Sequence, residues 1–341
     1  MLRLAINGYG RIGRHVLRAW FERGCPAALG FVAINDLGAA ETLVHLTRYD
    51  STHGRFYGEA NLIDGHLAMR SADGQQVCMI PLYNQALPEN LPWQALAVDV
   101  VLECTGQFRA KAEAARHVQA GAKKVIIGAA PFDEVDATIV YGVNHQQLTN
   151  EQKIISSVSC TTHALVPMMN ILDEAFGIDS ALMTEIHAVT SDQVLLDHTH
   201  RDLRRGRAAA HNIIPTTSSS IGAVKRVLPH LADKIDGYSI RVPTLNVAAV
   251  DLSFVAQRPI SKAAINQLFS QKAAHEYAQI LAYCDEWLVS SDFNHSPYSL
   301  IFDATETRVV GQQAKVLAWY DNEWGYANRL LDLCLMLARM H

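Results

Sequence analysis

A glycine-rich turn between a strand pattern and a helix pattern constrains the fold of this chain more than any other feature. The sequence GYGRIG at 8–13 follows an apolar strand pattern at 2–7 and opens an amphipathic helix pattern. Asp36 ends the next strand pattern, residues 29–36. Such glycines let a pyrophosphate approach a helix N-terminus, and a carboxylate after the second strand binds a ribose 2'-hydroxyl and repels a 2'-phosphate. The pattern therefore predicts a Rossmann-type domain that binds NAD rather than NADP.

A second turn belongs to the same predicted site. Thr105-Gly106 ends the strand pattern of residues 98–106 and is expected at the carboxyl edge of the sheet, where dinucleotides bind in such folds. A simple strand-ending turn explains the same two residues equally well. The expected cofactor contacts in these turns are Gly8, Gly10, Arg11, Ile12, Gly13, Asp36, Thr105 and Gly106.

The remaining patterns predict two domains and a closing helix. Strand patterns at 123–129 and 137–144 continue the rhythm of a parallel sheet, whereas residues 37–97 are less regular. In the second half, residues 240–257 predict long strands rather than a helix, and residues 261–283 predict a helix. We expect an α/β fold with an NAD-binding domain at 1–158, an α+β catalytic domain with a largely antiparallel sheet at 159–320, and a C-terminal helix at 321–341 that packs on the NAD-binding domain.

Length, charge and cysteine usage narrow the classes of protein that fit. At 341 residues the chain is too long for one ordinary core, which favours two domains of about 150 residues. A net charge of -5 gives no electrostatic reason to expect nucleic-acid or membrane binding. No signal-peptide core or apolar run of about 18 residues is present, so we expect a cytoplasmic protein. The six cysteines form no C-x-x-C pair, so we expect no metal site and no disulfide framework.

One cysteine stands where a strand pattern meets a helix pattern. Cys160 lies at this join within residues 154–177, and the other five cysteines lack such a setting. The unpaired N–H groups and the dipole at a helix N-terminus stabilise a thiolate, which is the nucleophilic form of cysteine. We therefore expect Cys160 to be a catalytic nucleophile.

His187 is the best candidate for the base that takes the proton of Cys160. The strand pattern LMTEIHAV at 182–189 brings the chain back toward the cysteine after its helix. A satisfied histidine in the core is the alternative that the pattern leaves open. Beside a dinucleotide site, such a pair suggests thiolate addition to an aldehyde, hydride loss to nicotinamide, and a thioester that phosphate or water cleaves. The Cys160 backbone N–H is expected in the oxyanion hole.

Five longer motifs carry a family resemblance that runs essentially from end to end. They are INGYGRIGR at 6–14, SCTT at 159–162, DLRRGRAAA at 202–210, RVPTLNV at 241–247 and WYDNEWGYANR at 319–329. In these motifs the chain resembles the glyceraldehyde-3-phosphate dehydrogenase superfamily. The resemblance implies NAD-dependent oxidation of an aldose phosphate, with Cys160 as nucleophile and His187 as its base, in a homotetramer.

The same resemblance implies roles for residues around the nucleophile. Asn322 would hold the nicotinamide carboxamide, with a helix N-cap as the alternative role, and Leu37 accompanies Asp36 in favouring NAD. The family places two anion sites beside the cysteine, where Arg offers a permanent charge and a planar fork to phosphate oxygens. The substrate-phosphate site matches Thr190, Asp192 and Arg241, and the site for the attacking phosphate matches Ser159, Thr161, Arg204, Ser218 and Ser219.

The basic loop that contains Arg204 has a second interpretation. Taken alone, a run of charges in a polar loop is most simply a solvated surface segment. We therefore expect at least one of Arg204, Arg205 and Arg207 to serve structure or a subunit contact.

Several positions depart from the family pattern. His163 stands where the family usually has Asn, and Ser218-Ser219 replaces a Thr-Gly pair, which puts a Cβ where an anion approaches. Ala86 replaces an arginine near the adenine, and Thr199 replaces a proline near the ribose. These changes predict a reshaped phosphate site, weaker NAD binding and less complete exclusion of NADP.

The residues leave the substrate open between two aldose phosphates. Segments 136–148, 172–178 and 290–299 are similar to the erythrose-4-phosphate dehydrogenase branch, whereas 187–193 and 320–326 are similar to glycolytic enzymes. We expect oxidation of glyceraldehyde 3-phosphate with inorganic phosphate in glycolysis. One alternative is oxidation of D-erythrose 4-phosphate to 4-phosphoerythronate, with water cleaving the thioester. The alternative from another class is a redox-responsive or RNA-associated binding protein.

Overall fold

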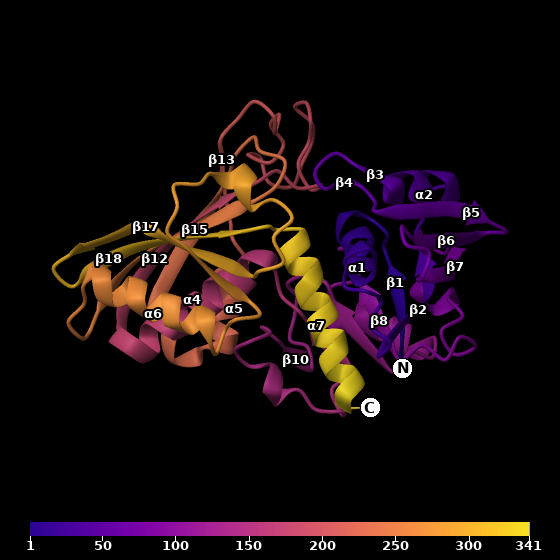
Figure 1. The fold of residues 1–341 in the computed structure, drawn as a ribbon, viewed down its shortest axis with the longest axis horizontal. Coiled ribbons are helices and arrows are strands. Elements are labelled where there is room, and N and C mark those ends of the chain that lie inside the picture. Colours follow the sequence, from indigo (N-terminus) through magenta and orange to yellow (C-terminus); the bar gives the residue numbers. More distant parts are fainter. Residues whose placement is uncertain (341) are drawn as a thin grey trace. The chain divides into compact units, whose positions relative to one another are not determined.

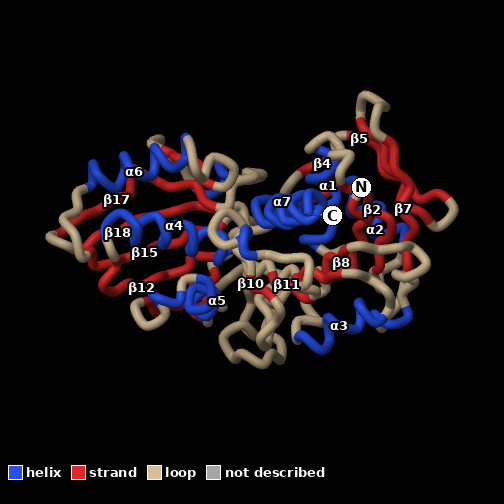
Figure 2. Tube along the Cα trace, turned by 90° about the horizontal axis from the view of Figure 1, so that it is seen from below, coloured by secondary structure: helices blue, strands red, loops and turns tan. Residues whose placement is uncertain are grey.

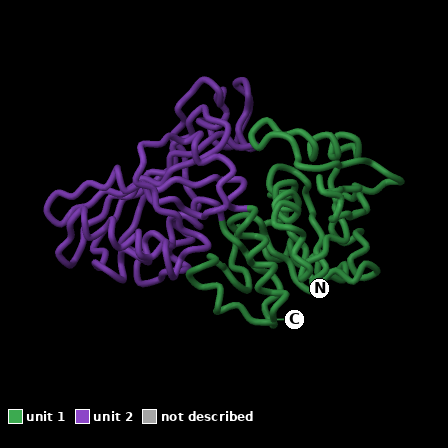
Figure 3. Tube along the Cα trace, in the orientation of Figure 1, with its two compact units in different colours: residues 1–158, 327–341 green, residues 159–326 purple. Residues whose placement is uncertain are grey.

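The computed structural model describes residues 1–340 of the chain. The chain forms two compact units, Met1–Val158 with Ala327–His341 and Ser159–Tyr326 (Figure 3). Each unit contains one large β-sheet. None of the helices in the described part of the chain is long and apolar enough to cross a membrane.

The first unit is built on a nine-stranded sheet (Figure 1). The strands run in the order β10 (Ala137–Thr138), β11 (Ile154–Ser156), β9 (Lys124–Ile127), β8 (Val100–Glu103), β1 (Leu2–Asn7), β2 (Leu29–Asn35), β7 (Val77–Tyr83), β6 (His66–Ser71) and β5 (Gly58–Ile63). Neighbours from β10 to β7 pair in parallel, and β7, β6 and β5 form an antiparallel extension. The extension lies within the stretch that the sequence marked as irregular.

Helices connect the parallel strands of this sheet. Helix α1 (Arg11–Glu22) links β1 to β2, and α3 (Lys111–Gln119) links β8 to β9. The closing helix, α7 (Trp324–Met340), returns to this unit, where Arg23 Nη2 donates to Asp332 Oδ1 at 2.8 Å. The shorter elements are α2 (Ala40–Arg48), the hairpin of β3 (Tyr49–Asp50) and β4 (Gly54–Arg55), and the 3-10 turns η1 (Pro88–Asn90) and η2 (His145–Gln147).

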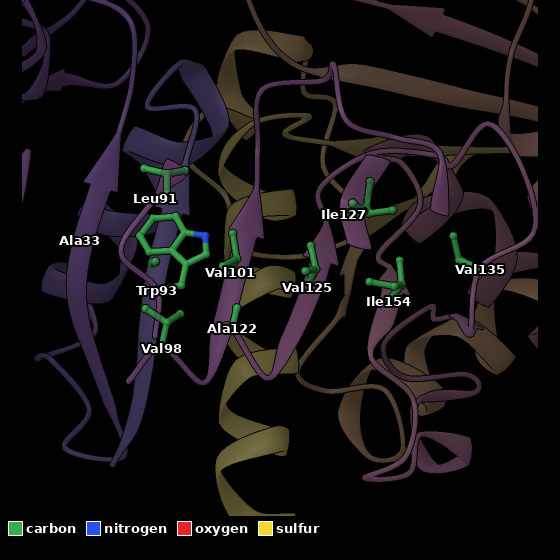
Figure 4. Close-up of a cluster of buried hydrophobic side chains, with 12 residues drawn as sticks. Ala33, Leu91, Trp93, Val98, Val101, Ala122, Val125, Ile127, Val135 and Ile154 are labelled. Atoms are coloured by element: carbon green, nitrogen blue, oxygen red, sulfur yellow. The ribbon is translucent and has the colours of Figure 1, made fainter. Parts of the chain in front are cut away.

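Apolar side chains from adjacent parallel strands pack into one core cluster (Figure 4). Val101, Val125 and Ile154 come from β8, β9 and β11, and Trp93 is fully buried beside them. Ala114 of α3 belongs to the same cluster. Burial of apolar surface on this scale holds the strand ends in place, and the polar residues of the predicted cofactor site follow those ends.

The predicted strand at 137–144 is wrong beyond its first two residues. Only β10 is extended there, and Gly142 has a φ of +93°. The Asn144 side chain holds the turn, because its Nδ2 donates to Thr138 O at 2.9 Å and its Oδ1 accepts from Val140 N at 2.8 Å. Asn side chains commonly close turns through such local bonds, which compete with strand pairing.

The second unit contains a seven-stranded sheet that is largely antiparallel. Its order is β13 (Ile214–Thr216), β14 (Ile235–Arg241), β12 (Ile178–His187), β15 (Ala248–Ala256), β18 (Gln313–Tyr320), β17 (Leu300–Val310) and β16 (Leu281–Cys284). Only the pairs β12 with β14 and β16 with β17 are parallel. The helices are α4 (Cys160–Phe176), α5 (Ser220–Val227) and α6 (Lys262–Ala274), with turns η3 (Pro229–Leu231) and η4 (Ser290–Phe293) (Figure 2).

Helix α4 packs against the middle of this sheet, on β12, β15, β17 and β18. Twelve of its residues are buried, which suits a helix with apolar side chains on most of its faces. Together, a mostly parallel sheet and a mostly antiparallel one confirm the predicted fold class.

One of the predicted elements in this unit is wrong in extent. The strands predicted at 240–257 are the end of β14 and the whole of β15, and β12 lies between these two strands in the sheet. The chain must leave the sheet to pass β12, and Val247 turns it with a φ of +67°. The helix predicted at 261–283 ends at Ala274, and Leu281–Cys284 forms strand β16 instead.

Candidate active site

Cys160 is the first residue of α4, as the strand and helix patterns predict. Ser159 caps the helix, and its Oγ accepts a hydrogen bond from Thr162 N at 3.2 Å. A serine at this position satisfies one of the unpaired N–H groups of the first turn. The thiol therefore lies at the positive end of a capped helix that packs against the sheet.

The structure brings His187 to the thiol. His187 is the last residue of β12, and its Nε2 lies 3.6 Å from Cys160 Sγ. The parallel register of β12 with β14 places Arg241 directly opposite His187, and Arg241 Nη1 lies 2.7 Å from His187 Nδ1. Three residues that are far apart in the sequence thus form one contiguous cluster.

The proton arrangement on His187 follows from its two other contacts. Its Nδ1 lies 2.7 Å from Ala188 O, which can only accept a hydrogen bond. If Nδ1 donates to that carbonyl, it has no lone pair left to accept from Arg241, and Nε2 is left as the acceptor that faces the thiol. In this tautomer His187 is ready to take a proton from Cys160, and Arg241 acts on it as a nearby positive charge.

Burial dominates the proton affinities of the pair. It raises the pKa of the Cys160 thiol to about 12, and the Glu185 carboxylate adds to the rise. Burial also lowers the pKa of His187 to about 4, with the Arg241 guanidinium adding to the fall. Both shifts arise because a poorly solvated site disfavours the charged form of each side chain. The thiolate that the helix N-terminus favours stays a prediction.

Two side chains next to the pair were missed by the sequence analysis. Glu185 and Tyr320 are 3% and 1% exposed, and both contact Thr161 Oγ1 at 2.7 Å. Glu185 stands two residues before His187 and so shares its face of the strand. A carboxylate on the inward face of the strand pattern LMTEIHAV was a readable signal, whereas no local pattern marks Tyr320.

Small hydroxyl side chains join α4 to α5 beside the cysteine. Ser159 Oγ lies 2.8 Å from Thr162 Oγ1 and 3.2 Å from Ser220 Oγ. Ser220, which the sequence analysis did not single out, is fully buried. Ser218 and Ser219 directly precede α5, and Ser218 Oγ accepts from Ser220 N at 3.3 Å. Of the residues predicted for the second anion site, Ser159, Ser218 and Ser219 therefore lie near the start of α5, whereas the Thr161 hydroxyl is engaged by Glu185.

The arginines of the basic loop differ in whether they form ion pairs. Arg205 Nη1 pairs with Asp192 Oδ2 at 2.7 Å, and Arg207 Nε pairs with Asp197 Oδ2 at 2.9 Å. Arg204 is exposed, and its guanidinium has no ion pair among the described residues. The expectation that at least one of these arginines serves structure agrees with the two ion pairs. Thr190 N donates to Gln193 Oε1 at 3.3 Å.

The glycine turn of the first unit has the geometry that a pyrophosphate requires. Gly8 has a φ of +90°, and a Cβ there would lie 2.6 Å from Thr105 N. A Cβ on Gly13 would lie 2.2 Å from Gly8 O, so both positions exclude a side chain. Gly10 caps α1 without any side-chain hydrogen bond, and nothing lies within 4 Å of a Cβ built on it. This uncapped helix start with open space fits a bound dinucleotide.

The other predicted cofactor residues of this unit surround that turn. Asp36 Oδ2 accepts from Tyr9 N at 2.7 Å, and the adjacent Leu37 is 60% exposed. Ile12 is half-buried in α1, and Arg11 Nη1 pairs with Asp50 Oδ2 at 2.5 Å. Thr105 and Gly106 follow β8, where Thr105 N donates to Glu103 Oε1 at 2.8 Å. The structure thus brings the predicted residues of this unit to one turn and its neighbouring strand ends.

Two further residues named by the family pattern lie in the second unit. Asn322 is 7% exposed, and its Oδ1 has no hydrogen-bond partner among the described residues. A buried amide oxygen without a partner fits a residue that binds a carboxamide. His163 is buried in α4, with its ring centroid 5.9 Å from that of Tyr326.

Comparison with known proteins identifies the family. Residues 2–111 match the family model described as glyceraldehyde 3-phosphate dehydrogenase, NAD binding domain, and residues 159–322 match glyceraldehyde 3-phosphate dehydrogenase, C-terminal domain. The plasmid glyceraldehyde-3-phosphate dehydrogenase of Cupriavidus necator is 50% identical over 337 residues, 99% of this chain and 98% of the relative. The enzyme of that name from Xanthobacter flavus is 47% identical over 342 residues, 99% of each chain. These matches confirm the predicted superfamily, the NAD cofactor and the dehydrogenase class. The chain belongs to the glyceraldehyde-3-phosphate dehydrogenase family.

Proposed function

We propose that the protein oxidises glyceraldehyde 3-phosphate with NAD and inorganic phosphate, through a thioester on Cys160. The observation that carries this proposal is the 3.6 Å contact of Cys160 Sγ with His187 Nε2 at the start of a capped helix. The printed names of the curated relatives support the choice of substrate. NAD, when bound, supplies the hydride acceptor.

Cys160 and His187 carry the proposed covalent steps. His187 Nε2 takes the thiol proton while Cys160 Sγ bonds to the aldehyde carbon, and His187 passes that proton to the carbonyl oxygen, which becomes the hydroxyl of a hemithioacetal. His187 then accepts the hydroxyl proton as hydride leaves the same carbon, which leaves an acyl group on Cys160. A phosphate oxygen attacks the thioester, the C–S bond breaks, and Cys160 departs as a thiolate. The Cys160 backbone N–H stabilises the oxyanion that forms at the acyl carbon.

Arg241 is the proposed anchor for the substrate phosphate. Its Nε is buried and has no hydrogen-bond partner among the described residues, although its Nη1 contacts His187. A guanidinium with a buried, unused donor is suited to a phosphate. Thr190 and Asp192 complete this proposed site, and the attacking phosphate is assigned to Ser159, Thr161, Arg204, Ser218 and Ser219.

The roles of the two halves of the chain follow from these assignments. We assign NAD binding to residues 1–158, with Asn322 holding the nicotinamide carboxamide, and catalysis to residues 159–320. Residues 321–341 form the closing segment against the NAD-binding domain. The homotetramer and the cytoplasmic location stay predictions.

Turnover with purified protein tests the function. We expect NADH formation from glyceraldehyde 3-phosphate that depends on inorganic phosphate, and loss of turnover by at least about a thousandfold in Cys160→Ser, because the nucleophile is removed. Calorimetric titration of Cys160→Ser with NAD is the control for folding, and we expect wild-type affinity.

The same assay separates the alternatives. A higher kcat/KM for D-erythrose 4-phosphate, with turnover that persists without phosphate, would replace the proposed substrate and the phosphorolysis step. Absence of NADH formation from either aldose phosphate would contradict the enzyme function altogether and favour a binding protein.

A further inference from the structure

A fully buried hydroxyl lies between the two segments that are assigned to the attacking phosphate. Ser220 is the first residue of α5 and has no exposed surface. Ser218 and Ser219 precede it in one segment, and Ser159 caps α4 in the other. Because a buried hydroxyl costs free energy unless hydrogen bonds satisfy it, the contacts of Ser220 indicate what this side chain does.

Ser220 contacts both segments. Its backbone N donates to Ser218 Oγ at 3.3 Å. Its own Oγ lies 3.2 Å from Ser159 Oγ and 3.1 Å from Thr162 Oγ1. These contacts join the first turns of α4 and α5, two helices that pack against each other. Ser220 thus links Ser159 and Ser218, which the proposed function assigns to the same anion.

The direction of each hydrogen bond among the three hydroxyls follows from their number of protons. A serine or threonine hydroxyl donates one hydrogen bond and accepts up to two. Thr162 Oγ1 donates to Ser220 Oγ, so Ser159 donates in the 2.8 Å contact between Ser159 and Thr162. Ser159 then has no proton left, and Ser220 Oγ donates to Ser159 Oγ. The three hydroxyls therefore form a closed ring of hydrogen bonds.

This ring determines what the Ser159 hydroxyl can offer to an anion. Its oxygen accepts from Ser220 Oγ and from Thr162 N, which lies at 3.2 Å, and these two bonds use both of its lone pairs. Only the Ser159 proton can be redirected to a ligand. A phosphate oxygen that takes this proton replaces the neutral Thr162 oxygen as acceptor, and a charged acceptor forms the stronger hydrogen bond. The bond from Ser220 remains and polarises the Ser159 hydroxyl further.

We propose that Ser220 is a positioning residue for the attacking phosphate, because it sets the Ser159 hydroxyl as a hydrogen-bond donor to that anion. The inference rests on the proposed function, since it concerns the step in which phosphate cleaves the thioester. Ser220 acts through Ser159 rather than on the phosphate itself. Its backbone N–H also holds the Ser218 hydroxyl of the same site.

Deletion of the Ser220 hydroxyl tests this role. Ser220→Ala removes the bond to Ser159 Oγ and keeps the backbone bond to Ser218. We expect the KM for inorganic phosphate to rise about fivefold, as for the loss of one neutral hydrogen bond, and the KM for glyceraldehyde 3-phosphate to change less than about twofold. Steady-state NADH formation at saturating NAD, with each substrate varied in turn, measures both constants.

The first turnover gives a second readout, which a general disturbance of α4 would move. Without phosphate the reaction forms NADH once and stops at the thioester, so the rate of this burst depends on Cys160 and His187 and not on the attacking phosphate. We expect the burst rate of Ser220→Ala to equal that of the wild type. Damage to the start of α4 would slow the burst as well, because Cys160 directly follows Ser159.

Two control variants show whether the hydroxyl itself is responsible. Ser220→Thr keeps a hydroxyl at this position, and we expect a phosphate KM close to that of the wild type. If the added methyl group prevents folding, Ser220→Cys supplies a weaker donor, and we expect an intermediate phosphate KM. Ser299→Ala removes another buried hydroxyl, whose Oγ has no hydrogen-bond partner among the described residues, and both KM values should stay unchanged.

The outcomes separate this inference from the proposed function. Phosphate-dependent turnover in the wild type, together with an unchanged phosphate KM in Ser220→Ala, would overturn the role of Ser220 alone. A burst slowed as strongly as the phosphate KM is raised would do the same, because the effect would then be structural. Wild-type turnover that does not need phosphate would instead overturn the phosphorolysis step, and the role of Ser220 with it.

Discussion

Two buried carboxylates, one in each unit, show how surroundings decide what the same group does. Glu103 at the end of β8 accepts from Asn7 Nδ2 at 2.6 Å, His117 Nε2 at 3.0 Å and Thr105 N at 2.8 Å, and also from the Thr105 hydroxyl. Glu185 accepts from one hydroxyl and lies 3.8 Å from His187 Nε2. A carboxylate with saturated oxygens fixes its neighbours, whereas one with few donors leaves its charge to act on them.

In the Glu103 network, the contacts determine which group donates each hydrogen bond. Trp93 Nε1 can only donate, and it lies 2.9 Å from His117 Nδ1. His117 must therefore carry its hydrogen on Nε2, which donates to Glu103. Glu103 in turn holds Thr105, whose backbone nitrogen lies where a Cβ on Gly8 would collide. This network supports the glycine turn of the NAD-binding domain, whereas the proposed mechanism requires the Cys160–His187 pair in the second unit to exchange protons.

Removal of the saturated carboxylate has the largest expected effect on stability. Glu103→Ala leaves the buried donors of Asn7, His117 and Thr105 without an acceptor, and we expect a loss of about 4 kcal/mol in the free energy of unfolding. NAD affinity should fall as well, because the Thr105-Gly106 turn loses its anchor. Urea denaturation and calorimetric titration with NAD measure the two effects. A loss below 1 kcal/mol would contradict the stabilising role that is assigned here to the Glu103 network.

Removal of the Thr161 hydroxyl, which donates to Glu185, has a smaller expected effect on stability. Thr161→Val deletes one hydrogen bond to a charged group, and we expect a loss of about 2 kcal/mol in the same denaturation experiment. Thr162→Val is a useful comparison, because among the residues that the structure describes its hydroxyl contacts only the hydroxyls of Ser159 and Ser220. A loss in Thr161→Val that exceeds the loss in Glu103→Ala would reverse the contrast between the two carboxylates.

The parts of the protein that sequence could predict are those with local patterns. The glycine turn, Asp36, the placement of Cys160 at a helix start and the inward His187 each follow from residues within one strand or one turn. The parallel first sheet follows from the same rhythm of short apolar strands. These features could be predicted because each depends on residues that are close together in the sequence.

The parts that could not be predicted depend on pairing across long separations. The order β14-β12-β15 places β12 between two strands that are adjacent in sequence, and no local pattern in residues 240–257 indicates this separation. Contacts of Tyr320 with Thr161 and of Arg241 with His187 arise from the same sheet. The pKa of the Cys160 thiol could not be predicted from the sequence either. It depends on burial, which a position at a helix N-terminus does not reveal.

Direct detection of the covalent intermediate tests the central claim. The protein is mixed with NAD and glyceraldehyde 3-phosphate in the absence of inorganic phosphate, quenched in acid within one turnover, and digested for mass spectrometry. We expect a phosphoglyceroyl adduct on the peptide that contains Cys160, and we expect added phosphate to remove it. Formation of NADH under these conditions without any adduct on Cys160 would contradict the account.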